Sequence, residues 1–122
     1  MIKRVEVGGS LKDAARRFGD AWAKAERGDA VEATETITFV SWSALAAVMT
    51  DKRHELLQHL HQHPATSIRA LARDIGRDYK RVHEDLAALA AVGLVERRDD
   101  AWRADYDEIH TSITLTPPRA AE

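Results

Sequence analysis

The chain contains no cysteine, which excludes disulfide bonds, a cysteine-based zinc site and a thiol nucleophile. Only three of its 122 residues are proline and six are glycine, too few for a collagen-like or low-complexity chain. No hydrophobic run approaches the roughly 20 residues of a membrane-spanning helix. Residues 1–9 also lack the apolar core of a signal peptide. We therefore expect a cytoplasmic protein with no membrane segment.

A large excess of charge of one sign is also missing. The formal net charge is −2, unlike that of a protein that coats nucleic acid nonspecifically. A composition of 44% hydrophobic and 31% charged residues is typical of a globular chain. There is no glycine-rich phosphate loop, and Ser41, Ser43 and Ser67 fit helix caps better than a nucleophile–base set. We expect neither an enzyme nor a bound cofactor.

The hydrophobic pattern predicts an α+β fold. Residues 2–7, 34–40 and 109–115 alternate as half-buried strands do. An amphipathic stripe predicts a helix over 10–28, between the first two strands. A short helix should follow over 41–49, with Trp42, Leu45 and Met49 on one face.

Three further helices and a hairpin complete the expected fold. Thr50, Ser67 and Asp78 are the expected N-caps, and Pro64, Gly76 and Gly93 mark the ends of the same helices. Residues 94–98 and 101–106 form a hairpin about Asp99-Asp100. A short helix, a three-residue turn, a second amphipathic helix and a hairpin make up a winged helix-turn-helix. We divide the chain into a dimerising arm (1–49), this DNA-binding domain (50–106) and a C-terminal strand with a tail (107–122).

The helix that begins at Asp78 is the expected recognition helix. With Val82 at the centre of its inward face, Lys80 and Glu84 point outward at 100° per residue. Lysine and arginine reach phosphate or guanine, tyrosine and histidine hydrogen-bond phosphate, and glutamate accepts from cytosine. The candidate DNA-contacting residues are Ser67, Arg69, Arg77, Tyr79, Lys80, Arg81, His83 and Glu84, with Arg97, Arg98 and Arg103 on the hairpin.

The same residues have a plainer interpretation. Charged side chains on a helix usually form a solvated face. Residues 66–103 hold eight cations against seven acids, and Asp99 and Asp100 at the hairpin tip would repel phosphate. The order of the elements, rather than the charge, favours DNA.

The segment TSIRALARDIGRDYKRVHEDLAALAAVGLVERR resembles the winged helix-turn-helix of the MarR- and ArsR-like regulators. A narrower group of predicted regulators is similar from about Leu11 to Leu115, through TDKRHELLQHL and Tyr106-Asp107-Glu108-Ile109. The resemblance implies a homodimer on double-stranded DNA, reading two half-sites. It also implies an autoregulating repressor, or an antitoxin with a toxin-like partner.

Two alternatives remain open from the sequence. The domain could instead be a protein-interaction module that neutralises a cognate partner, as the low net charge and apolar strands allow. Glu55, His59 and His63 lie at i, i+4 and i+8 of one helix and could serve a metal- or ligand-responsive sensor. An exposed polar stripe is the default interpretation of these three residues, so no metal site is predicted.

Overall fold

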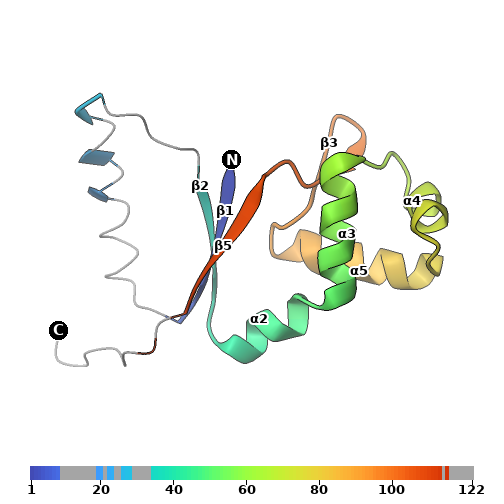
Figure 1. Cartoon of the computed structure of the whole chain (residues 1–122), viewed down its shortest axis with the longest axis horizontal. Helices are drawn as coiled ribbons and strands as arrows, with labels where there is room; N and C mark the ends of the chain where they lie inside the picture. The colour runs from blue at the N-terminus through green and yellow to red at the C-terminus, as the bar shows by residue number, and fades with distance from the viewer. Residues whose placement is uncertain (9–18, 21, 24–25, 29–33, 114, 116–122) are drawn as a thin grey trace. The chain divides into compact units, whose positions relative to one another are not determined.

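The computed structural model describes residues 1–8, 19–20, 22–23, 26–28, 34–113 and 115 (Figure 1). The elements are β1 (Ile2–Val7), β2 (Thr34–Phe39), α2 (Trp42–Val48), α3 (Asp51–Gln62), α4 (Ile68–Ile75), α5 (Tyr79–Ala91), β3 (Glu96–Arg98), β4 (Ala101–Arg103) and β5 (Glu108–Ile113). They form two compact units, one built around β1, β2 and β5 and the other spanning Ser43–Asp107. The predicted α+β class is confirmed.

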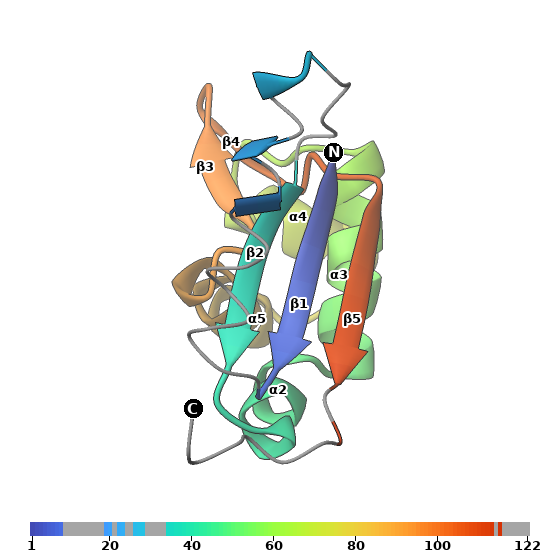
Figure 2. The ribbon, with the colours of Figure 1, turned by 90° about the vertical axis from the view of Figure 1, so that its left-hand side faces the viewer.

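The first unit contains a parallel sheet of order β2-β1-β5, with β1 in the centre (Figure 2). In the register, Val5 lies beside Ile37 and Thr111, and Val7 lies beside Phe39 and Ile113. Successive side chains of a strand point to opposite faces, so one face of the sheet is largely apolar. The opposite face carries Arg4, Glu6 and His110.

All three predicted strands are confirmed, although β2 and β5 differ slightly from their predicted limits. The C-terminal strand pairs with β1, and so joins the same unit as the N-terminal strands instead of forming a separate segment. The helix predicted over 10–28 lies largely outside the described residues. Within that stretch Trp22 is 60% exposed, and its indole Nε1 donates to Glu26 Oε1 at 2.7 Å.

The helical unit is held together by a core of leucines. Its largest fully buried side chains come from α3, α4, α5 and the segment after α5, namely Leu56, Leu60, Leu71, Val82, Leu86, Leu89 and Leu94. Truncating such a leucine to alanine typically costs about 2–5 kcal/mol. Within the described part of the chain, no helix is both long enough and apolar enough to cross a membrane.

The segment after β4 is attached to this core by Tyr106. Its hydroxyl donates to the carbonyl oxygen of Leu94 at 2.9 Å, and the ring is buried. Burial disfavours the phenolate and raises the pKa of Tyr106 to about 12. The contact fixes the chain immediately before β5 begins.

Of the three residues predicted to share a face of α2, Trp42 is the one that the structure leaves largely exposed. Leu45 is buried, Met49 is half-buried and Trp42 is 58% exposed. Trp42 is the first residue of a helix of only seven residues. A helix of two turns buries only the centre of its apolar stripe, so the tryptophan at its start remains in contact with solvent.

Candidate nucleic-acid interface

The turn between α4 and α5 is fixed by capping interactions at both ends. Ser67 Oγ accepts a backbone N–H of the first turn of α4 at 3.0 Å. At the end of α4, Gly76 has a φ of 67°, in the left-handed region that glycine adopts without strain. Asp78 Oδ2 accepts the backbone N–H of Arg81 at 3.2 Å and starts α5. The predicted caps are confirmed, and three residues separate the helices.

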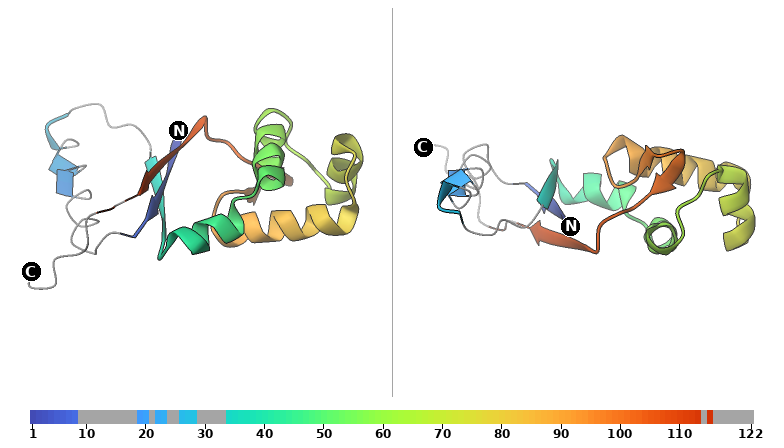
Figure 3. Two further views of the ribbon diagram at one scale, coloured as in Figure 1. Left: turned by 60° about the horizontal axis from the view of Figure 1, so that its bottom comes forward. Right: turned by 90° about the horizontal axis from the view of Figure 1, so that it is seen from above.

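Helix α5 buries one side and exposes the other. Val82, Leu86 and Leu89 are buried, and α4 packs across the N-terminal end of α5 (Figure 3). The predicted division of the helix into faces is therefore confirmed. The exposed residues of its first two turns are Tyr79, Lys80, Arg81, His83 and Glu84.

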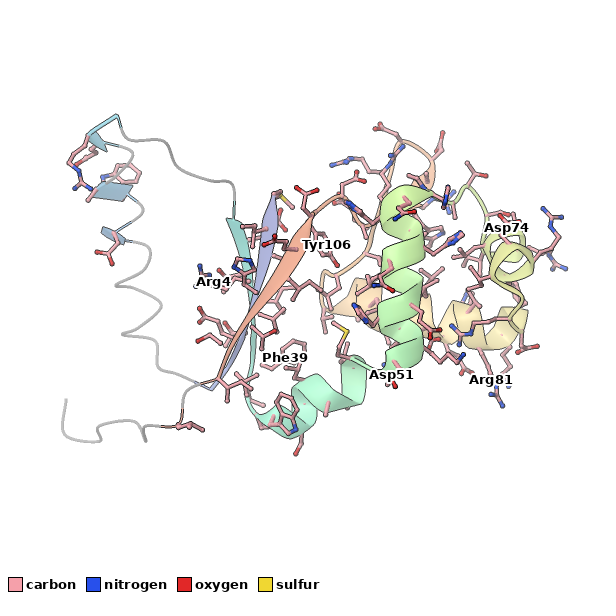
Figure 4. The ribbon with its side chains drawn as sticks, viewed as in Figure 1. Arg4, Phe39, Asp51, Asp74, Arg81 and Tyr106 are labelled. Atoms are coloured by element: carbon pink, nitrogen blue, oxygen red, sulfur yellow. The ribbon has the colours of Figure 1, made fainter. Side chains whose placement is uncertain are left out.

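Two cations stand free at this end of α5. Among the described residues, no carboxylate lies within the 4.0 Å of an ion pair from the side chain of Lys80 or Arg81. The side chain of Arg81 extends away from the helices of its unit (Figure 4). The nearest acids in sequence are Asp78, which is engaged as the N-cap, and Glu84. The first turn of α5 therefore presents positive charge to the solvent.

Aromatic contacts order the side chains between α4 and α5. The guanidinium carbon of Arg69 lies 5.1 Å from the ring centroid of Tyr79, within the range of a cation–π contact. The rings of Tyr79 and His83, one turn apart, have centroids 6.1 Å apart. These contacts hold a cation, a phenol and an imidazole together beside Lys80.

Arg77, predicted to contact DNA, is turned inward toward its own helical unit. Its Nη2 lies 2.7 Å from Asp85 Oδ2, and only 18% of its side chain is exposed. The other carboxylate oxygen, Asp85 Oδ1, accepts from Arg53 Nε at 3.0 Å. The carboxylate of Asp85 lies between the two guanidiniums and holds Arg77 inward, so its guanidinium is not presented to a base or phosphate. We remove it from the DNA-contacting set.

Arg53 extends this network to α2. Its Nη1 donates to the carbonyl oxygens of Ala47 and Val48, at 3.0 and 2.9 Å. These carbonyls belong to the last turn of α2, where a cation is favourable for the helix dipole. One carboxylate, Asp85, thereby links the end of α2, the first turn of α3, the turn before α5 and the middle of α5.

The hairpin β3–β4 follows α5. Glu96 pairs with Arg103 and Arg98 with Ala101, which leaves Asp99 and Asp100 as a two-residue loop. Both aspartates have positive φ, 52° and 60°, as a type I′ turn requires. The predicted hairpin is confirmed, with strands of only three residues each.

The three hairpin arginines differ in how much charge they offer. Arg98 pairs with Glu96 at 3.1 Å and closely with Asp105, and Arg103 Nε donates to the carbonyl oxygen of Arg98 at 3.0 Å. Arg97 instead lies over the ring of Trp102, its guanidinium carbon 5.8 Å from the centroid. Arg97 is therefore the hairpin arginine best placed to reach a phosphate without losing an ion pair.

The histidines of α3 do not assemble the three-residue stripe considered from the sequence. The rings of His59 and His63 are 5.1 Å apart, but Glu55 pairs with Lys52 at 3.6 Å. His61 Nδ1 is instead 2.9 Å from the carbonyl oxygen of Ala104. An open depression is lined by Gln58, His59, His61, Gln62 and His63. No group of three metal-ligating side chains occurs among the residues that the structure describes.

Comparison with known protein families matches residues 48–111 to the family described as HVO_A0114. This is more than half of the chain. The chain belongs to the HVO_A0114 family. No curated protein and no solved structure matches it. The matched residues begin at the end of α2 and end within β5, so they contain the entire candidate interface of this HVO_A0114 protein.

Two residues that organise the interface were not singled out from the sequence. They are Asp85 and Arg53, neither of which belongs to a motif in the sequence. The signal was nevertheless present, because Asp85 directly precedes the buried Leu86 and lies on the flank of the inward face of α5. A carboxylate at the margin of a buried stripe requires a cationic partner.

Proposed function

We propose that this protein is a sequence-specific DNA-binding transcriptional regulator, and that α4, α5 and the β3–β4 hairpin act as a winged helix-turn-helix. In this proposal α5 enters the major groove with its N-terminal end toward the bases. The hairpin lies along the flanking backbone.

One observation carries the proposal, the free pair of cations on the first turn of α5. Asp85 is occupied by Arg53 and Arg77, and Asp78 is occupied as the N-cap. Lys80 and Arg81 therefore keep their charge for an external anion. On α3, by contrast, the exposed Lys52 already has a partner, Glu55, at 3.6 Å.

The other proposed DNA contacts are of two kinds, contacts to phosphate and contacts to bases. Arg69 and Tyr79 can together cover one phosphate, and Arg97 a second on the side of the hairpin. In this proposal Glu84 accepts from a cytosine amino group, and His83 donates to phosphate. Ser67 serves α4 as a cap and can still donate its hydroxyl proton to backbone phosphate.

We extend the proposal to a homodimer on a palindromic operator, with half-sites about one helical turn apart. Autorepression of its own operon and an antitoxin role follow only from the resemblance to the predicted regulators. They belong to the proposal on that basis.

The decisive test compares two exposed lysines on helices of the same unit. Lys80→Ala removes the proposed contact, and Lys52→Ala removes the same charge from α3. Duplex binding is measured by fluorescence anisotropy with a randomised 30-base-pair probe across a salt series. Lys80→Ala should lower the slope of log K against log salt by about 0.9, the value for one phosphate contact, and Lys52→Ala should leave it unchanged.

The double variant Lys80→Ala/Arg81→Ala should lose about 1.8 of the slope if both residues contact phosphate. Circular dichroism of each variant must match the wild type, since both positions are exposed. Unchanged affinity of the double variant, for both the random probe and the DNA upstream of its own gene, would refute the DNA-binding proposal.

A second candidate function, a protein-interaction module, is favoured by a different observation. Val40 and Trp42, two residues apart in the chain, are 89% and 58% exposed. Exposed large apolar side chains near each other often mark a protein-binding surface. A purified complex with the product of the adjacent gene, lost in Trp42→Ser, would support this function. Failure of Trp42→Ser to weaken such a complex would remove this surface from consideration.

A further inference from the structure

We infer that two copies of this chain associate through the outer edge of β5. The two β5 strands would lie antiparallel about a two-fold axis at Thr111, giving one continuous sheet of order β2-β1-β5-β5-β1-β2. The inference rests on the homodimer of the proposed function and assigns its interface. The partner is a second copy of the same sequence.

The starting observation is that β5 is an edge strand whose side chains are exposed. It pairs with β1 on one side, and no described strand pairs with it on the other. Five of its six residues are exposed, including Ile113 at 47%. An edge strand offers unpaired backbone N–H and C=O groups to any strand that approaches.

The five positions that would pair lack the devices that normally prevent such pairing, and the acid of β5, Glu108, lies outside them at the start of the strand, where it pairs with His110. Residues 109–113, IHTSI, contain no proline, lysine, arginine or acid, and the regular pairing with β1 continues through Ile113 without a bulge. β-Branched residues at three of these five positions favour an extended strand. Among the described residues, none pairs with this edge, which leaves positions 109–113 available to a further strand.

The sequence of β5 is also complementary to itself. A two-fold axis perpendicular to the sheet preserves its faces, and with Thr111 on the axis Ile109 of each copy lies opposite Ile113 of the other. On the other face His110 lies opposite Ser112. Ile113 lies next to Val7 in its own sheet, so the apolar face would continue from one copy into the next. The neighbouring register, centred on His110, would place two imidazoles side by side and bury less apolar surface.

The opposite edge of the sheet is less suited to this role. Strand β2 carries Glu35, which pairs with Lys3 on the apolar face. In either register that pairs five residues of β2 with a second β2, this carboxylate lies opposite Ile37 or Phe39. Such a pairing would leave a charge beside an apolar side chain, so β5 is the edge we assign to the dimer.

The absence of native cysteine makes a direct test possible in the full chain. In the assigned register the two Thr111 Cα atoms lie about 4.5–5.5 Å apart, within disulfide range. Thr111→Cys should therefore form a covalent dimer rapidly under mild oxidation at micromolar protein. His110→Cys and Ser112→Cys are the controls, because each of these residues is about 7–8 Å from its own counterpart and should cross-link slowly.

A mixture supplies a second, independent readout of the register. His110→Cys protein mixed with Ser112→Cys protein should cross-link faster than either protein alone, since these positions face each other across the axis. In parallel, Thr111→Lys places two ammonium groups on the axis and should give a monomer in sedimentation velocity. Thr36→Lys, on the exposed edge of β2, should leave the wild-type distribution unchanged.

The outcomes separate this inference from the proposed function. Equal rates of cross-linking at positions 110, 111 and 112 would overturn the β5 interface. So would a wild-type protein that remains monomeric at 100-micromolar concentration, on the order of 100-fold above the cross-linking condition. Monomeric protein that still shifts duplex DNA in a Lys80-dependent way would overturn the interface alone. Fast cross-linking at Thr111 with no DNA shift would instead refute the DNA-binding proposal and leave the dimer standing.

Discussion

Replacing Asp85 with alanine should destabilise the helical unit more than any other change of a single charged residue in it. The side chain is only 14% exposed, and its two oxygens hold Arg53 at 3.0 Å and Arg77 at 2.7 Å. Without the carboxylate, two guanidiniums of 18% exposure lose their counter-charge. Arg77 Nη1 is already buried without a hydrogen-bond partner, so the network has little room to rearrange.

The magnitude follows from this burial. Breaking a fully buried ion pair costs about 3–5 kcal/mol, and partial exposure of these side chains reduces the expected cost to about 2–4 kcal/mol. For a unit of this size, that corresponds to a fall in melting temperature of roughly 8–30 °C. Asp85→Asn, which keeps one acceptor oxygen, should lie between alanine and the wild type.

The assay is urea and thermal unfolding followed by circular dichroism at 222 nm. Glu55→Ala is the matched control, because it also removes one helical carboxylate. The carboxylate of Glu55 pairs with a cation, Lys52, at 3.6 Å, but on the surface. An exposed pair of this kind contributes less than about 1 kcal/mol. If Asp85→Ala proved no more destabilising than Glu55→Ala, the role assigned to the network would be refuted.

Three further substitutions test local features, each by the same unfolding measurement. Gly76→Ala should cost about 1 kcal/mol, because the left-handed φ of 67° strains a Cβ even though no atom lies within 4 Å of it. Tyr106→Phe should cost about 1 kcal/mol at pH 7 through the hydrogen bond lost to Leu94. Because the folded pKa of Tyr106, about 12, exceeds the usual 10.0, wild-type stability declines as pH rises from 10 to 12, and the difference in stability between the wild type and the variant should narrow there. Asp100→Gly should stabilise by about 0.5–1 kcal/mol, since glycine adopts the φ of 60° freely; a destabilised variant would contradict the type I′ turn.

Local chemistry made much of the helical unit predictable. Ser67, Asp78 and Gly76 each act within one helical turn of their own position, so their capping roles can be read from neighbouring residues. The inward face of α5 follows from the 3.6-residue period alone. The same holds for the two-residue loop at Asp99-Asp100, because only certain residues tolerate two successive positive φ values.

Long-range partners were the part that the sequence left open. Whether Arg77 points to solvent or inward depends on Asp85 and on Arg53, which is 32 residues away from Asp85. The side chains of these three cations therefore point in different directions although their local sequence is similar: Lys80 and Arg81 point outward, and Arg77 points inward. The same limit applies to Glu55, whose spacing to His59 and His63 is that of metal ligands but whose carboxylate pairs with Lys52.

Strand order was also beyond local reasoning. Alternation located β5 but could not reveal that it pairs with β1, because strand pairing depends on contacts between residues about a hundred positions apart. The exposure of Trp42 could not be predicted either, because hydrophobic periodicity indicates which residues share a face of a helix but not whether another element covers that face.

The pairing of β1 with β5 has a consequence for the order in which the chain acquires structure as it leaves the ribosome. All of Ser43–Asp107 is synthesised before the last strand, so the helices can pack while β1 still has one side open. Until Glu108–Ile113 emerges, the backbone groups on that side of β1 are unpaired along all six residues of the strand. A nascent chain stalled at this stage would be the form most prone to pair β1 with a strand of another chain that is translated from the same mRNA.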